Sequence, residues 1–194
     1  MCSSDLQGLP ISVRMLCEAH GLLLDGVRGA DKQPGVLRRS QNWIGGTRPG
    51  NAAFVPPPPQ EVAVLLADLE RFVHAPDADL PPMVRVALIH AQFETIHPFL
   101  DGNGRIGRLL IAALFEHWGL LAEPLVHLSG YLKQHQAECY RRLSAIRTDG
   151  DWEGWVAFFL EGVAVASADA ERSIIDVRSE EHTSELQSRQ YLVC

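Results

Sequence analysis

The sequence has little of what marks secreted, metal-bound or membrane proteins. Its only cysteines are Cys2, Cys17, Cys139 and Cys194, and their spacing matches neither a zinc site nor a disulfide framework. No apolar run reaches the length of a membrane span, and the first residues lack a basic segment followed by an apolar one. We therefore expect a soluble, cytoplasmic protein in a reducing compartment that does not bind a membrane.

Positive charge is also scarce. Lys and Arg number 17 against 24 Asp and Glu, which gives a formal net charge of -7. This balance excludes a diffuse basic surface for nucleic acid, so any anion must be bound at a local site. No Gly-x-x-x-x-Gly-Lys segment occurs, which excludes a P-loop enzyme. With 194 residues and 46% apolar content, the chain suits one domain with its own core.

What the sequence does contain is a series of helical patterns. Apolar residues recur at helical spacing in residues 12–24, 60–75, 80–96, 105–119, 129–150 and 151–174. Residues 36–47 instead have the composition of a short strand or hairpin, and four consecutive prolines at 56–59 favour an extended strap. We predict an all-α fold, a helical bundle with a small β-hairpin flap.

The two ends of the chain differ from the rest. Residues 1–6 and 178–194 resemble translations of the two strands of a short-read sequencing adapter. Segments of that kind do not take part in fold reasoning. We therefore expect a domain over residues 7–177 that is truncated at both ends.

The segment HPFLDGNGRIGR, residues 97–108, carries more chemistry than a turn between helices needs. An ordinary turn uses one or two glycines and no pair of arginines. The helix that begins here directs free amides and the positive end of its dipole toward the loop, which suits an anion. Gly102 and Gly104 let the backbone approach a phosphate, and Arg105 and Arg108 share the first helical turn. The combination predicts binding of a polyphosphate.

Two further residues extend this prediction. A carboxylate such as Asp101 tolerates a neighbouring polyphosphate when a divalent cation lies between them. His97 is the group of the segment that takes up a proton near neutral pH. Each residue alone is more often a cap, a turn or a surface charge, but their combination favours a site with a base, a metal ligand and a phosphate cradle.

The segment matches the signature of the Fic family, His-x-Phe-x-Asp/Glu-Gly-Asn-Gly-Arg-x-x-Arg, at every fixed position. RRSQNWIGG resembles the target-docking flap of Fic proteins of the adenylyltransferase type. GNAAFVPPPP resembles the strap that follows it, and GDWEGWVAFFLEGV the late helix. The resemblance implies a Fic-type helical bundle. It also implies an enzyme that transfers AMP from ATP to a Ser, Thr or Tyr hydroxyl of a target protein and releases pyrophosphate.

The resemblance also implies a role for each loop residue. His97 is expected to be the general base, Asp101 to bind Mg²⁺ or Mn²⁺, and Asn103 to hold the α-phosphate. The rest of the expected nucleotide site comprises Phe99 as the packing anchor of the loop, Gly102, Gly104, Arg105, Arg108 and, on a later helix, Tyr140. Arg147 and Tyr140 stand where relatives contact the nucleoside, whereas Cys139 replaces a tyrosine that many relatives have.

The flap is expected to pair with an extended segment of the target by strand addition. Its residues are Leu37, Arg38, Arg39, Ser40, Gln41, Asn42, Trp43 and Ile44. A capping hairpin that binds no target is the alternative for this segment.

Other functions also remain open for the whole domain. The same fold could transfer phosphocholine or UMP, remove AMP, or bind nucleotide or a partner without turnover. A homodimer is also possible. The family's inhibitory motif, Ser/Thr-x-x-x-Glu-Gly/Asn, is absent from this chain, and we expect the parent protein to carry it upstream.

Overall fold

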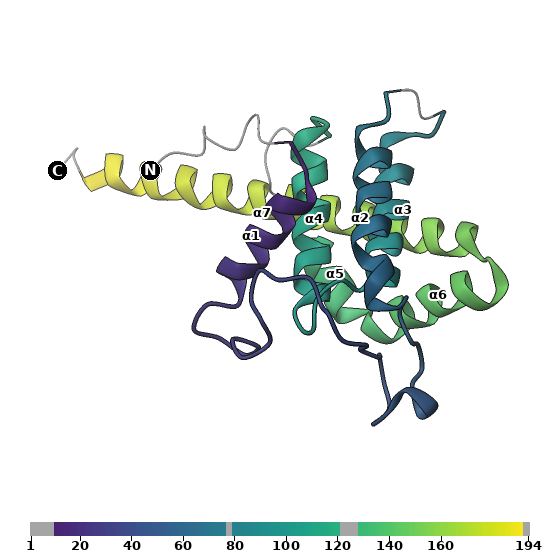
Figure 1. Cartoon of the computed structure of the whole chain (residues 1–194). Coiled ribbons are helices and arrows are strands. Elements are labelled where there is room, and N and C mark those ends of the chain that lie inside the picture. Colours follow the sequence, from purple (N-terminus) through teal and green to yellow (C-terminus); the bar gives the residue numbers. More distant parts are fainter. Residues whose placement is uncertain (1–9, 77–78, 121–127, 192–194) are drawn as a thin grey trace.

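The computed structural model describes residues 10–76, 79–120 and 128–191. It is a bundle of helices, as predicted, in which α2, α3 and α4 stand side by side and the long α7 crosses behind them (Figure 1). The described helices are α1 (Val13–Leu23), α2 (Pro59–His74), α3 (Pro82–Ile96), α4 (Asn103–His117), α5 (Leu128–Gln134), α6 (Gln136–Asp149) and α7 (Trp152–Tyr191). No helix in these ranges combines the length and apolar character needed to cross a bilayer.

Helix α3 forms the centre of the core. It begins at Pro82, the position at which a helix tolerates proline best, because the missing amide has no helical partner there. The helix packs against α2, α4 and α7, and it is apolar nearly all round because neighbours cover most of its surface. Its buried residues are Val86, Ala87, Ile89, His90, Ala91, Phe93 and Ile96.

Two polar contacts fix the neighbours of α3. The indole Nε1 of Trp155, at 0% exposure, donates to the carbonyl oxygen of Ala87 at 2.8 Å and joins α7 to α3. The guanidinium of Arg85 donates to carbonyl oxygens at the C-terminal end of α2 and lies over the ring of Trp118, 4.7 Å from its centroid. These contacts hold α3 in place, and its C-terminal end carries the site.

The structure differs from the sequence-based expectations in three places. The helix expected over residues 129–150 is divided into α5 and α6 at His135. The expected β-hairpin flap forms a single antiparallel bridge between Ile44 and Phe54, with a short 3₁₀ helix, η1 (Pro49–Asn51), between them. Helix α7 continues to Tyr191 and so includes most of the segment 178–194. The domain boundaries at residues 7 and 177 stay a prediction, and residues 1–9 lie outside the described ranges.

Trp155→Phe should lower the free energy of unfolding by about 1–3 kcal/mol, because it removes a buried donor and leaves a small cavity. Chemical denaturation measures this change. Trp152 on the same helix is 40% exposed, and Trp152→Phe should stay within about 0.5 kcal/mol of the parent. Equal effects of the two substitutions would contradict the proposed tie between α7 and α3.

Candidate active site

The loop between α3 and α4 begins with an unusual backbone conformation at His97. Its φ of 49° and ψ of 61° are left-handed, and its N–H donates to the carbonyl oxygen of Phe93 at 2.9 Å. For a residue with a Cβ atom this conformation costs about 1–2 kcal/mol. The surrounding structure must therefore stabilise the turn.

The buried guanidinium of Arg38 stabilises this turn through hydrogen bonds. Its Nε donates to the carbonyl oxygen of His97 at 2.9 Å, and its Nη2 donates to those of Ile96 at 3.2 Å and Pro57 at 2.5 Å. The residue is 2% exposed. A cation beside the last carbonyl groups of a helix also interacts favourably with the helix dipole. Asn42 adds a bond from Nδ2 to the carbonyl oxygen of Phe99 at 3.0 Å, so the flap and the loop form one unit.

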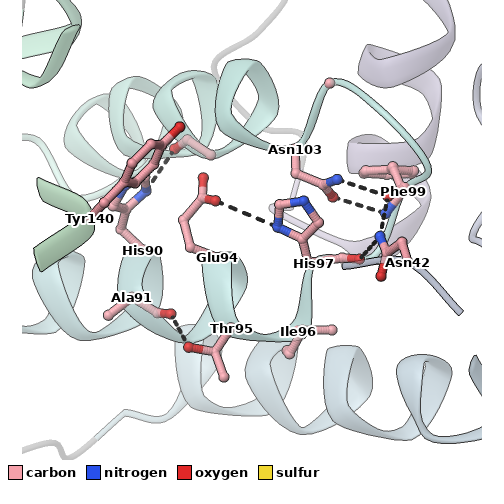
Figure 2. A network of polar contacts seen from close by, with 12 residues as sticks. Asn42, His90, Ala91, Glu94, Thr95, Ile96, His97, Phe99, Asn103 and Tyr140 are labelled. Atoms are coloured by element: carbon pink, nitrogen blue, oxygen red, sulfur yellow. Dashed lines mark hydrogen bonds and ion pairs between the residues drawn. The ribbon is translucent and has the colours of Figure 1, made fainter. Parts of the chain in front are cut away.

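The far side of the loop is closed by Asn103. Its Oδ1 accepts the backbone N–H of Phe99 and its Nδ2 donates to the carbonyl oxygen of the same residue, both at 2.8 Å (Figure 2). The Phe99 ring is fully buried and stacks on the His20 ring with centroids 3.8 Å apart. Phe99 thus packs as an anchor. The predicted role of Asn103 toward an α-phosphate stays a prediction, because here its side chain closes the loop.

The beginning of α4 is suited to an anion. Gly102 precedes the helix with a φ of 82°, and the first-turn amides and the dipole make this end positive. Arg105 lies in the first turn of α4 and Arg108 just beyond it, and both side chains are half-buried. The Gly104 side of the helix faces the Arg108 guanidinium, since a Cβ atom at Gly104 would lie 3.4 Å from its Nη1. The first-turn amides, Arg105 and Arg108 thus give this end of α4 a positively charged surface.

Asp101 lies at the edge of this surface. Its Oδ1 accepts the Gly102 N–H at 2.6 Å, and its Oδ2 lies 3.9 Å from the Arg105 guanidinium. Within the described ranges, no group of three or more His, Cys, Asp and Glu side chains could hold a metal ion. A single carboxylate still fits Mg²⁺, which often binds to one carboxylate and completes its shell with substrate phosphates and water.

The imidazole of His97 is 19% exposed, and its low pKa leaves the ring neutral near pH 7. Burial lowers its pKa to about 4, and the positive charges of Arg147 and Arg38 act in the same direction. A neutral imidazole has a free nitrogen lone pair, which is what a proton acceptor needs. The site therefore combines a neutral imidazole with a positively charged helix end.

The remaining predicted site residues are spread over the flap and α6. Of the flap, Arg39, Ser40 and Trp43 are exposed, and Leu37, Gln41, Asn42 and Ile44 are half-buried. Arg38 differs from the expectation for a docking residue, because backbone carbonyl groups occupy its guanidinium. Tyr140 is 54% exposed on α6, where its hydroxyl accepts a hydrogen bond from Gln136. Arg147, expected near the nucleoside, lies over the Phe54 ring, 3.6 Å from the centroid.

The fold is a helical bundle whose central loop brings a histidine next to a helix N-terminus and two arginines. The model of the Fic/DOC family matches residues 10–115, and the chain belongs to this family. The resemblance inferred from residues 97–108 is thereby confirmed.

Relatives and solved structures agree with this assignment. "Protein adenylyltransferase Fic" of Drosophila yakuba is 29% identical over 160 residues, which are 82% of this chain and 29% of the relative. The Drosophila willistoni protein of that name is 30% identical, also over 82% of this chain and 29% of the relative. The chain thus spans under a third of these relatives' length.

A Fic family protein from Desulfovibrio desulfuricans superposes with a TM-score of 0.70 and 28% identity, over 83% of this chain and 47% of that one. Fic-1 of C. elegans shares the fold at a TM-score of 0.61 and 24% identity, over 88% of this chain and 45% of its own.

Arg38→Met should lower the free energy of unfolding by about 2–4 kcal/mol, because several buried carbonyl groups lose a charged donor. The neighbouring exposed residue offers a matched control, since Arg39→Met keeps the change in charge and should alter stability by about 0.5 kcal/mol or less. Urea denaturation of both variants makes the comparison. If Arg38→Met were as stable as Arg39→Met, Arg38 would not be the residue that stabilises the His97 turn.

Proposed function

We propose that this chain transfers AMP from ATP to a Ser, Thr or Tyr hydroxyl of a protein. The observation that carries the proposal is the position of a neutral His97 directly before a helix N-terminus lined by Arg105 and Arg108. The names of the Drosophila relatives support AMP as the transferred group. The Gly102-Asn103-Gly104 segment is unchanged from the family signature, which argues against the kinase-like relatives, since these replace it.

In the proposed reaction, the hydroxyl oxygen of the target attacks the α-phosphorus of ATP while His97 accepts the hydroxyl proton. A new P–O bond forms, the bond between the α-phosphorus and its bridging oxygen to the β-phosphate breaks, and pyrophosphate leaves with both bonding electrons. Positioning and neutralisation of charge provide most of the acceleration in phosphoryl-type transfers. Amides at the start of α4 and the two arginines provide that neutralisation here.

Asp101 would hold Mg²⁺ or Mn²⁺ against the phosphates, and the ion would supply further neutralisation of their charge. The hydrogen bond from the Gly102 N–H to Oδ1 fixes the carboxylate, while Oδ2 lies toward Arg105. Gly29 keeps its backbone close to the same oxygen, because a Cβ atom there would lie 2.8 Å from Oδ2. The carboxylate is therefore held in one place before any ligand binds.

The partner in this proposal is a protein with an accessible hydroxyl. The exposed Trp43, Ser40 and Arg39 lie on the flap, whose backbone is tied to the loop through Arg38 and Asn42. A target segment on this flap would thus be held at a fixed distance from His97.

Mass spectrometry of the modified peptides identifies the transferred group. The protein is incubated with ATP and, in parallel, with UTP or CDP-choline.

His97→Ala should reduce AMP transfer by about 10²-fold or more, because the proton acceptor is lost. ATP binding measured by calorimetry should change little, since His97 lies before the phosphate cradle. His117→Ala removes an exposed histidine at the other end of α4 and should retain full activity. Transfer at the parental rate by His97→Ala would remove His97 from the mechanism.

Asp101→Ala should abolish the dependence of transfer on Mg²⁺ or Mn²⁺, together with most of the activity. Without a cation, a carboxylate near phosphates repels them. The measurement is a metal titration of the transfer rate after chelation, with the exposed Asp68→Ala as the control. Full activity of the parent chain in excess chelator is the result that contradicts a metal site at Asp101.

A further inference from the structure

Glu94 is a carboxylate beneath the loop that the family signature does not include. It lies one helical turn before His97 on α3, with a side chain that is 12% exposed. One carboxylate oxygen, Oε2, lies 3.8 Å from Nδ1 of His97, as the dashed line in Figure 2 marks. Among the described atoms, His97 Nδ1 is buried and has no hydrogen-bond partner of good geometry, although the backbone carbonyl of Glu94 lies near enough to oppose the lowering of the His97 pKa. A buried donor or acceptor without a partner costs stability, so this nitrogen calls for an explanation.

Helix α4 makes room for the carboxylate at Gly107. A Cβ atom at this position would lie 2.5 Å from the Glu94 Oε1 and 3.0 Å from Cε1 of His90. Gly107 falls on a variable position of the family signature, so the phosphate loop does not require glycine there. Glycine also weakens a helix interior relative to alanine. The glycine is therefore explained by the carboxylate that occupies its side of the helix.

The charged and titratable groups around Glu94 come from three elements. Arg108 lies on α4, Arg147 and Cys139 on α6, and His90 and His97 on α3 or at its end. Arg38 and Asp101 act on His97 from the flap and the loop. Burial raises the pKa of Glu94 to about 7, and the positive charges of Arg108 and Arg147 oppose that rise.

Three neighbours of Glu94, which are His90, Cys139 and Arg147, keep their charge state near neutral pH. Burial lowers the pKa of His90 to about 4 and raises that of the Cys139 thiol to about 12. The pKa of Arg147 is lowered by burial to about 10, so this guanidinium stays charged. Glu94 is thus the group of this cluster whose charge changes around neutrality.

We propose that Glu94 is a positioning residue that selects the tautomer of His97. The ionised carboxylate accepts the Nδ1–H of His97 and leaves Nε2 as the proton acceptor for the target hydroxyl. The protonated carboxylic acid instead donates to Nδ1, which places the ring proton on Nε2 and removes the acceptor. The distance of 3.8 Å is longer than a hydrogen bond, but such contacts often tighten when substrate binds. This inference rests on the proposed role of His97 as the base.

The rate of AMP transfer should increase with pH around neutrality. Above the pKa of Glu94 the carboxylate is charged and His97 is competent. As the pH falls through about 7, Glu94 takes up a proton and activity is lost, although His97 itself is still neutral. The acidic limb of the rate profile thus belongs to Glu94 and not to the base.

The first test compares the pH profiles of AMP transfer by the parent, Glu94→Gln and Glu116→Gln, an exposed glutamate on α4. Glu94→Gln should lower kcat by roughly tenfold or more without changing KM for ATP, as the loss of a partner that orients a catalytic group does. It should also lack the acidic limb near neutral pH, whereas Glu116→Gln keeps the parental profile. A parental kcat and limb in Glu94→Gln would overturn the inference.

A second variant leaves Glu94 in the chain and moves its carboxylate. Gly107→Ala should displace the side chain and lower kcat as Glu94→Gln does, with helical circular dichroism unchanged. Gly130→Ala is the matched control, since no heavy atom lies within 4 Å of a Cβ atom built at Gly130. If Gly107→Ala were as active as Gly130→Ala, the position of the carboxylate would not matter for the base.

Nitrogen NMR of ¹⁵N-histidine-labelled protein separates this inference from the proposed function, because it needs no turnover. The His97 resonances are assigned by their loss in His97→Asn. They should show Nδ1–H above neutral pH and Nε2–H below it in the parent, and no such switch in Glu94→Gln. An Nδ1–H form at every pH in both proteins would show that the Glu94 backbone carbonyl orients the ring, and would overturn the inference even if AMP transfer occurs.

Discussion

The hydrogen bonds from the buried Arg38 guanidinium to the end of α3 are the constraint on which the site depends. A left-handed turn at a histidine is unfavourable by itself, and the donors from the flap stabilise it. The turn directs the chain away from α3 and into the loop, so that α4 begins beside the histidine. The segment proposed to bind a target and the loop proposed to bind phosphate are thereby joined by hydrogen bonds.

Burial then sets the charge of each group in this unit. The same desolvation lowers the pKa of His97 to about 4 and raises the pKa of Glu94 to about 7. Asp101 and Arg105 remain about a third exposed, so they stay accessible to a charged ligand. The site thus separates a buried region with His97 and Glu94, where the proposed proton transfer would occur, from an exposed region with Asp101 and Arg105, where phosphate would bind.

The sequence predicted the parts of this arrangement that depend on local patterns. The helical periodicity of 60–75 and 80–96 is strong, and α2 and α3 lie there. The loop was recognisable because its glycines and arginines fall at fixed offsets. The break at His135 has no glycine or proline to signal it, so one helix was expected where α5 and α6 occur.

Roles that depend on packing could not be read from the sequence. Arg38 was assigned to the docking flap by resemblance, and its burial is unexpected because arginine is almost never fully buried unless it is paired. Glu94 is a single acidic residue in an apolar helix, and its relation to His97 and Gly107 exists only in three dimensions. Asn103 illustrates the same limit, because the signature suggests a ligand contact and the structure adds a bond that closes the loop.

The central claim is that this loop directs attack at the α-phosphorus of ATP, and the position of a radioactive label tests it most directly. The chain is incubated with a hydroxyl-bearing protein and ATP labelled either in the α- or in the γ-phosphate. The account predicts that protein-bound label appears from α-labelled ATP alone, while the γ-label leaves as pyrophosphate. Protein-bound label from γ-labelled ATP, or from neither, would contradict it.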